Sequence, residues 1–440
     1  MPRYGLNEIM QLYAPKVATA IVIANMIGTG VFTTLGFQLL ELQSPVLILV
    51  LWAVGGLSAL CGAMCYAELG TRYPGSGGEV HFLGTLVHPY AGFLSGCVSA
   101  TIGFAAPTAL AALTFGTYLS AVSEQVNPTW AATLLIVSLV LIHAKTHSRS
   151  GSGQYLLTAL KLCLIVFFIV WALLKGPDFT GQLSFTAPIS WREAFGASSA
   201  VALIFINYAY SGWNAATYIL SEMENPAKNL PKVLLFGCGL VAVLYVLLNA
   251  VFIVSAPISE LRGKVEIGFV VANAIAGEAG GTLVAIVLAG ILISTVSAMV
   301  LAGPRALQRL GEDNRLFAPL AKRNRDGIPA RAILFMAAIA LVFLWTSTFR
   351  EILLFSGLMM AANTFVTVAA LFISRRNPQP VLNKTFQVPF FPLPVLIFLG
   401  ITGWTVVYSV QEYPIQLLLL VLISIIGFPL YKRYHLTPSD

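Results

Sequence analysis

Charged residues are scarce in this chain of 440 residues: they make up 10% of it, whereas hydrophobic residues make up 58%. A soluble domain typically carries about 25% charged residues, because its surface must be solvated. This deficit excludes a water-facing globule of such length. The composition predicts a single membrane domain made of many spans, in place of two or three soluble domains.

Residue types that carry catalysis or bind metals are equally sparse. The five cysteines all lie in apolar runs, with no metal-type neighbours and no loop position suited to a disulfide. They are Cys61, Cys65, Cys97, Cys163 and Cys238. His143 and His147 could share a helical face, but no carboxylate or cysteine is near them. We therefore expect packing cysteines, no metal, no cofactor and no enzyme.

Long polar segments are missing too, since the longest, 308–330, is only a loop between apolar runs. The formal net charge is +7, but the basic residues sit in short segments between those runs. A nucleic-acid-binding protein gathers them on one solvated face, so no nucleic-acid partner is expected. A channel would need a continuous polar stripe or charged ring along several spans, and no run offers one.

Twelve apolar runs are long enough, at roughly 20 residues, to be spanning helices. Their approximate bounds are 13–40, 45–70, 87–122, 128–144, 151–175, 194–221, 230–255, 279–308, 330–348, 351–374, 392–411 and 413–432. They are called spans 1 to 12. The sequence thus predicts an all-α membrane protein with about 12 transmembrane helices.

Positive charge in the short loops sets the orientation, because cytoplasmic loops are enriched in Lys and Arg. With a cytoplasmic N-terminus, 19 of the 25 Lys and Arg residues lie inside, five lie outside and Lys161 falls within a span. Both termini are then cytoplasmic. No cleavable signal pattern precedes span 1. The compact termini favour a bacterial plasma membrane.

Spans 1 and 6 are each interrupted near their middle by glycine and polar residues. Span 1 contains IGTG at 27–30, and span 6 contains NYAYSGWN at 207–214. Glycine weakens a helix interior by about 1 kcal/mol relative to alanine. A close helix–helix contact would explain either motif alone. Two broken helices five spans apart are, however, typical of the binding site of an inverted-repeat transporter.

Breaks of this kind suit a zwitterionic solute. Unwinding frees N–H groups at the start of a half-helix, where the helix dipole favours a carboxylate. It also exposes carbonyl groups that can accept hydrogen bonds from an ammonium group. The two breaks therefore predict a carrier for a small organic solute, most simply an amino acid.

At these residues the sequence resembles the amino acid–polyamine–organocation superfamily, in particular bacterial relatives of the L-type amino acid transporters. The matching segments are MIGTGVF at 26–32, YPGSGG at 73–78, YAYSGWN at 208–214 and EMENPAKNLP at 222–231. Thr29 stands where the family more often has serine. The matches lie in order over nearly the whole chain, which makes them more specific together than any one turn motif.

The resemblance implies the leucine-transporter fold, a 5+5 inverted repeat with broken spans 1 and 6. The first repeat would be residues 1–175, the second 190–375, and spans 11 and 12 with the tail would occupy 390–440. It also implies a substrate site at the two breaks. The site residues would be Met26, Ile27, Gly28, Thr29, Gly30, Val31, Tyr208, Ala209, Ser211, Gly212 and Asn214.

Within that site the resemblance implies distinct roles. Backbone amides from Thr29 to Val31 would receive the substrate carboxylate, and carbonyls at Met26, Tyr208 and Ser211 its amino group. Tyr208 would be an aromatic gate over the bound substrate, and Asn214 would line the same pocket. Animal L-type transporters are tied to a glycoprotein through a cysteine between spans 3 and 4. Residues 120–128 contain none, so no disulfide-linked accessory chain is expected.

Lys161 lies about twelve residues into span 5, too deep for its side chain to reach the interface comfortably. It could simply line a vestibule. In the resemblance it stands where sodium-coupled relatives hold an ion, so its ammonium would bind carbonyls around Ala24 or Asn25. That implies sodium-independent transport, with Lys161 as the coupling residue. Exchange is preferred, proton-coupled symport is the alternative, and a polyamine or organic-cation carrier ranks third.

Acidic residues inform the choice of substrate by their position. Glu41 and Glu68 fall near span ends, and no Asp or Glu is expected beside either break. A cationic substrate side chain would require an acidic partner. The sequence therefore favours small neutral L-amino acids carried by alternating access, with the lipid bilayer and the amino acid as partners.

Overall fold

The computed structural model describes residues 12–144, 151–175, 182–183, 189–324, 327–376 and 385–434. In this part of the chain the fold is helical, and an isolated parallel bridge joins Tyr13 to Met223. Eight helical segments are long and apolar enough to cross a membrane, and two shorter apolar helices accompany them. The all-helical membrane architecture is thus confirmed, whereas the count of twelve spans stays a prediction.

The helices follow the twelve apolar runs closely. The N-terminal half contains α1 (Pro15–Met26), α2 (Gly30–Glu41), α3 (Pro45–Arg72), α4 (Glu79–Leu86), α5 (Pro89–Thr101), α6 (Ala105–Val122), α7 (Pro128–His143), α8 (Gly151–Lys175) and α9 (Trp191–Ala194). The C-terminal half contains α10 (Ala197–Tyr210), η2 (Ala215–Glu222), α11 (Pro226–Ser255), α12 (Ile258–Leu261), α13 (Ile267–Asp313), η3 (Arg315–Phe317), α14 (Ala318–Ala321), α15 (Ala330–Thr346), α16 (Phe349–Arg376), α17 (Leu393–Glu412) and α18 (Pro414–Tyr434).

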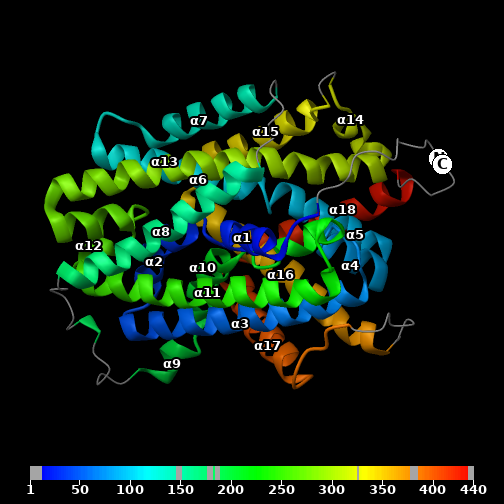
Figure 1. The fold of residues 1–440 in the computed structure, drawn as a ribbon, viewed down its shortest axis with the longest axis horizontal. Helices are drawn as coiled ribbons and strands as arrows, with labels where there is room; N and C mark the ends of the chain where they lie inside the picture. The colour runs from blue at the N-terminus through cyan, green and yellow to red at the C-terminus, as the bar shows by residue number, and fades with distance from the viewer. Residues whose placement is uncertain are drawn as a thin grey trace.

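Spans 1 and 6 are the broken spans, as the sequence predicts. Span 1 is divided into α1 and α2, and span 6 into α10 and the 3-10 helix η2. Both lie in the middle of the molecule, where α1 and α10 appear between α13 on one side and α3 and α11 on the other (Figure 1). The breaks are therefore surrounded by other helices, which exclude lipid from the unwound backbone.

Two further interruptions are absent from the predictions made from the sequence. Span 3 is divided into α5 and α6 between Ile102 and Phe104, and its two parts are long apolar helices. The predicted run 279–308 is part of α13, which is 47 residues long and kinked at Ala276 and Gly277, where Gly277 has φ +68°. The part of α13 before that kink is mostly apolar, and the small and polar residues at 276–281, AGEAGG, separate it from most of the predicted run.

The side predicted to be cytoplasmic, here called the inner side, carries a buried ion cluster. Glu68, at the end of α3, is fully buried and accepts hydrogen bonds from Arg375 at 2.8 and 2.6 Å. Arg72 lies 3.0 Å from the same carboxylate, and the N–H of Val388 donates to it at 2.7 Å. The cluster joins α3, α16 and the segment that leads into α17.

Removing Arg375 should therefore destabilise the fold. Arg375→Ala leaves the Glu68 carboxylate buried with only Arg72 as a counter-charge, and loss of one partner of a buried pair typically costs roughly 2–5 kcal/mol. We expect a clear fall in the melting temperature of the detergent-solubilised protein. Lys264→Ala is the matched control, because the Lys264–Glu266 pair is long at 3.8 Å and its lysine is half exposed. Equal melting temperatures for the two variants would contradict this role of Glu68.

Candidate functional site

The break in span 1 is a tight turn between two helices. Ile27 has φ −77° and ψ 80°, and the N–H of Gly28 donates to the carbonyl of Met26 at 2.8 Å. These values describe an inverse γ-turn, a turn of only three residues, which ends the helix. Its consequence is that α1 ends with exposed carbonyl groups and α2 begins with exposed N–H groups.

Side chains from other spans satisfy the carbonyls at the end of α1. The Tyr245 hydroxyl of α11 donates to the Met26 carbonyl at 2.6 Å, and the Lys161 ammonium of α8 donates to the Ile27 carbonyl at 3.2 Å. Lys161 thus binds the break, but at Ile27 and not around Ala24 or Asn25 as expected. The reason is the γ-turn, which turns the Ile27 carbonyl toward α8.

The N–H groups at the start of α2 differ from these carbonyls in their hydrogen bonding. Thr29 caps this helix without a side-chain hydrogen bond, and the structure records no acceptor for the N–H groups of Thr29, Gly30 or Val31. Three unpaired donors at a helix N-terminus form a site for an anion. Their position agrees with the carboxylate site that the family resemblance implies.

The break in span 6 is built around Gly212. This residue has φ +95°, a left-handed conformation that favours glycine, and lies against the backbone of Asn25. A Cβ atom on Gly212 would come within 2.7 Å of the Asn25 carbonyl carbon and oxygen. In the same way, a Cβ on Gly30 would come within 2.5 Å of Ala209 Cα. Each break therefore packs against the helix that the other one interrupts.

Tyr208, the expected gate, is buried in α10 with 6% of its surface exposed. Its hydroxyl lies beside the side chain of Thr29, so it reaches across from span 6 to the break in span 1. This placement is compatible with a lid over a solute bound at that break. The gating role itself stays a prediction.

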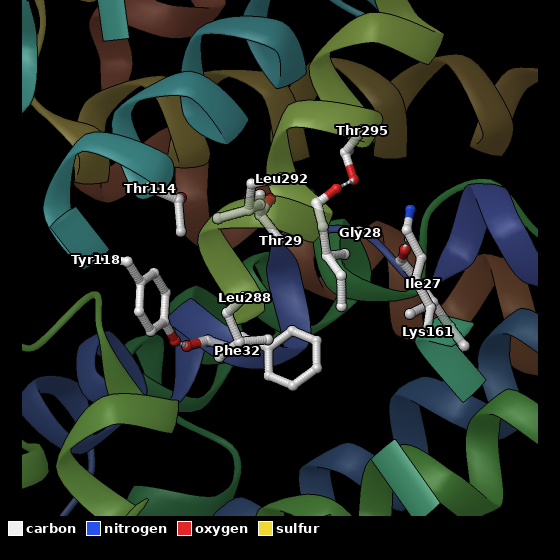
Figure 2. Close-up of a pocket in the computed structure, with 11 residues that line it drawn as sticks. Ile27, Gly28, Thr29, Phe32, Thr114, Tyr118, Lys161, Leu288, Leu292 and Thr295 are labelled. Atoms are coloured by element: carbon white, nitrogen blue, oxygen red, sulfur yellow. Dashed lines mark hydrogen bonds between the residues drawn. The ribbon is translucent and has the colours of Figure 1, made fainter. Parts of the chain in front are cut away.

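A small cavity lies beside the span 1 break, as Figure 2 shows. Ile27, Gly28, Thr29 and Lys161 line it, together with residues of α6 and α13 that the sequence did not indicate. Those residues are Thr114, Tyr118, Leu288, Ile291, Leu292 and Thr295. The expected site residues of span 6 do not line this cavity.

The walls contributed by α6 and α13 are mainly apolar. The Thr114 hydroxyl donates to Leu110 at 2.7 Å and the Thr295 hydroxyl to Ile291 at 3.2 Å, so each donates its proton within its own helix. Figure 2 shows Tyr118 and Thr114 on the side opposite Lys161, with the side chains of Leu288 and Phe32 close together between them. Lys161 is the only charged side chain among the residues that line it.

The expectation that no acidic residue lies beside a break is wrong, whereas the place of Asn214 in a substrate pocket stays a prediction. Asn214 does not line the cavity: its amide donates to the carboxylate of Glu79, a buried residue at the start of α4. An acidic residue therefore does lie beside a break, contrary to the sequence analysis. Glu79 follows two glycines in a loop, and its distance of 135 residues from Asn214 hid the contact. The only signal was its place directly after the YPGSGG motif.

His143 was considered as a metal ligand together with His147, which lies outside the described residues. The His143 ring nitrogen Nε2 is 2.8 Å from the Ser297 hydroxyl of α13, so this side chain joins span 4 to span 8. Among the residues that the structure describes, no three His, Cys, Asp or Glu side chains gather where they could hold a metal ion.

The packing of the two breaks predicts that a side chain at Gly212 destabilises the protein. Gly212→Ala must place a Cβ against the Asn25 backbone and hold a left-handed φ, which together should cost more than 1 kcal/mol. We expect a lower melting temperature and loss of function. Gly400→Ala in α17 is the control, because no atom lies within 4 Å of the added Cβ. If both variants melt like the parent chain, the proposed contact between the breaks is wrong.

Known proteins that resemble this chain are amino acid transporters. The family model described as amino acid permease matches residues 16–428. The mouse large neutral amino acids transporter small subunit 2 is 26% identical over 94% of this chain and 79% of its own length. The serine/threonine exchanger SteT of Bacillus subtilis is 27% identical over 94% of both chains. The mouse b(0,+)-type amino acid transporter 1 is 26% identical over 86% of this chain and 78% of its own length.

The family match covers almost the whole chain and includes both breaks, α3, α6, α8 and α13. The same relatives, in animals and in a bacterium, are named as amino acid transporters or exchangers. The chain is therefore a multi-pass membrane transporter that belongs to the amino acid permease family of the amino acid–polyamine–organocation superfamily.

Proposed function

We propose that this protein exchanges small neutral L-amino acids across the membrane by alternating access, without sodium. The observation that carries the proposal is the set of unpaired N–H groups at Thr29, Gly30 and Val31, next to a cavity with apolar walls. They provide a site for a carboxylate. A neutral side chain of the substrate would meet Leu288, Leu292 or Tyr118.

The amino group of the substrate needs carbonyl acceptors, and some carbonyls at the breaks already accept hydrogen bonds from the protein. The carbonyls of Met26 and Ile27 already accept hydrogen bonds from Tyr245 and Lys161. We therefore assign the amino group mainly to carbonyls of the span 6 break, at Tyr208 and Ser211. The Met26 carbonyl also accepts from the N–H of Gly28 at 2.8 Å, so both of its lone pairs are already in use.

Lys161 supports the absence of sodium coupling. Its ammonium is buried, with 6% of the residue exposed, and donates to the carbonyl at the centre of the break. A fixed cation bound there would hold the break in place, as a metal ion could do. We propose that Lys161 serves this purpose throughout the transport cycle, which leaves counter-transport of a second amino acid to return the carrier.

Proton-coupled symport is the alternative, and the same contact favours it as a second candidate. The recorded hydrogen bond of Lys161 reaches a single neutral carbonyl, and no carboxylate lies among the residues that line the cavity with it. Symport would use the proton of this ammonium group. Loss of that proton would free the Ile27 carbonyl and loosen the break.

The relatives guide the choice of substrates to test. The names of two of the relatives described above mention serine and threonine exchange and large neutral amino acids. We propose serine, alanine and leucine as the first candidates for this chain. The cytoplasmic position of both termini, the inverted repeat of residues 1–175 and 190–375, and the lack of a disulfide-linked partner belong to the same proposal.

Flux into proteoliposomes tests the function. Purified protein is reconstituted with or without internal amino acid, and uptake of labelled serine, alanine and leucine is measured at pH 5.5 and 7.5. For an exchanger we expect uptake that requires internal amino acid. Neither an imposed pH gradient nor sodium should change its rate. Uptake into empty vesicles that follows a proton gradient, and that Lys161→Ala abolishes, would instead establish symport.

Substitutions at Gly28 and Gly30 distinguish an effect on substrate binding from an effect on packing. A Cβ on Gly28 meets no atom within 4 Å and enters the cavity, whereas one on Gly30 collides with Ala209. Gly28→Val should keep the melting temperature of the parent chain and raise the KM for exchange by about tenfold or more, a loss of about 1.4 kcal/mol. Gly30→Val should lower both stability and activity. A Gly28→Val protein with the parent KM would overturn the site assignment.

A further inference from the structure

Glu79 is a buried carboxylate that the proposed transport cycle does not yet use. Only 1% of its surface is exposed, and three side chains donate hydrogen bonds to it. The Tyr66 hydroxyl of α3 donates at 2.9 Å, and Asn214 and the Tyr218 hydroxyl donate from span 6. Two of these three donors thus belong to the part of span 6 that follows its break.

Glu79 depends on these donors for its solvation. Among the described residues, none of the recorded ion pairs includes it, although Glu68 nearby on α3 has two arginines. A buried carboxylate without a counter-charge is costly unless hydrogen bonds replace water. Hydrogen bonds to a charged group are also stronger than those between neutral groups. The free energy of burying the Glu79 carboxylate therefore depends on the position of η2.

The loop before Glu79 contacts the same face of η2. Gly78 has φ +55°, and a Cβ there would come within 3.1 Å of the Thr217 hydroxyl and the Tyr218 ring. The N–H of Ser76 donates to the Ser221 hydroxyl at 3.1 Å, and the N–H of Ser221 donates to the Ser76 hydroxyl at 2.9 Å. We call this set of contacts, from Ser76–Glu79 to Asn214–Ser221, the η2 clasp.

The clasp also restrains α1, because η2 is joined to the start of that helix. The N–H of Tyr13 donates to the Glu222 carbonyl at 2.6 Å, and the N–H of Glu224 donates to the Tyr13 carbonyl at 3.1 Å. These bonds form the isolated β-bridge of the fold. The inner halves of spans 1 and 6 are thus connected to each other, and the clasp fastens both to α3 and α4.

We infer that Glu79 is a positioning residue for transport: it fastens the inner half of span 6, and its bonds to Asn214 and Tyr218 break when the carrier opens to the inner side. This inference rests on the proposed alternating-access function. Opening at that side requires the inner ends of spans 1 and 6 to leave the surrounding helices. The clasp is the set of polar contacts that opposes this movement, so it sets the balance between the two open states.

Sided exchange kinetics test the inference. The KM for serine is measured separately at the inner and outer faces for the parent chain, Glu79→Gln and Tyr218→Phe. A weaker clasp should populate the inward-open state, which lowers the apparent KM at the inner face and raises it at the outer face, each by about threefold to tenfold. Glu68→Gln is the matched control, because it changes a buried carboxylate of α3 that does not contact η2 in the structure.

A change of fold stability alone would not move the two KM values in opposite directions. Parallel changes at both faces in Glu79→Gln and Tyr218→Phe, or none, would overturn the inference. So would opposite shifts of equal size in Glu68→Gln. If the parent chain exchanges no amino acid at all, the proposed function fails, and the clasp must be tested in another way.

Cysteine labelling supplies that independent readout. Ala216 lies on η2 and is fully buried in this structure. In Ala216→Cys protein, a membrane-impermeant maleimide applied from the inner side should label this position severalfold faster when Glu79→Gln is added. Equal labelling rates with and without Glu79→Gln would contradict the clasp, whatever the transport assay shows.

Discussion

A helix that is broken inside a bilayer leaves polar backbone groups with no water to bind, and each such group costs several kcal/mol if unsatisfied. This constraint organises the centre of the molecule. At the span 1 break the carbonyls of Met26 and Ile27 receive Tyr245 and Lys161, from spans 7 and 5. The N–H groups of Thr29, Gly30 and Val31 have no partner recorded. The protein thus satisfies the carbonyl end of the break itself, and the N–H end is where we propose that the solute binds.

The same constraint explains why the two breaks touch. Gly30 lies against Ala209 and Gly212 lies against Asn25, so each unwound segment is covered by backbone of the other span. A side chain at either glycine would push the two segments apart and expose polar groups to lipid or to voids. The glycines are therefore required by close approach as much as by flexibility, and the substrate site depends on that contact for its shape.

The sequence predicted those features whose cause is local. Glycine and polar residues inside apolar runs placed both breaks correctly. The depth of Lys161 predicted that it does not reach the interface, and the family resemblance implied that it binds the first break. It was wrong about which carbonyl, because the partner depends on a turn at Ile27 that the residue types do not specify. The interruption of span 3 was missed, since residues 102–104 carry only one glycine and no polar group.

Contacts between distant segments could not be predicted in this way. Glu79 and Asn214 are separated by 135 residues, and nothing in either motif shows that a loop after span 2 would meet the inner half of span 6. The apolar cavity wall from α13 is a similar case, because Leu288, Leu292 and Thr295 are ordinary residues of a long apolar helix. Their roles follow from packing, which a single sequence does not reveal.

Three buried ionisable groups show how differently one membrane protein can solvate charge. Glu68 has two arginines and joins elements that have no reason to separate. Lys161 has a backbone carbonyl, and Glu79 has two hydroxyl groups and an amide. Neutral partners bind a charge less tightly than an opposite charge does, so such contacts can form and break during a cycle at lower cost. For Glu79, neutral donors agree with the proposed release of η2 during the cycle, whereas Glu68 pairs with arginine where α3 meets α16.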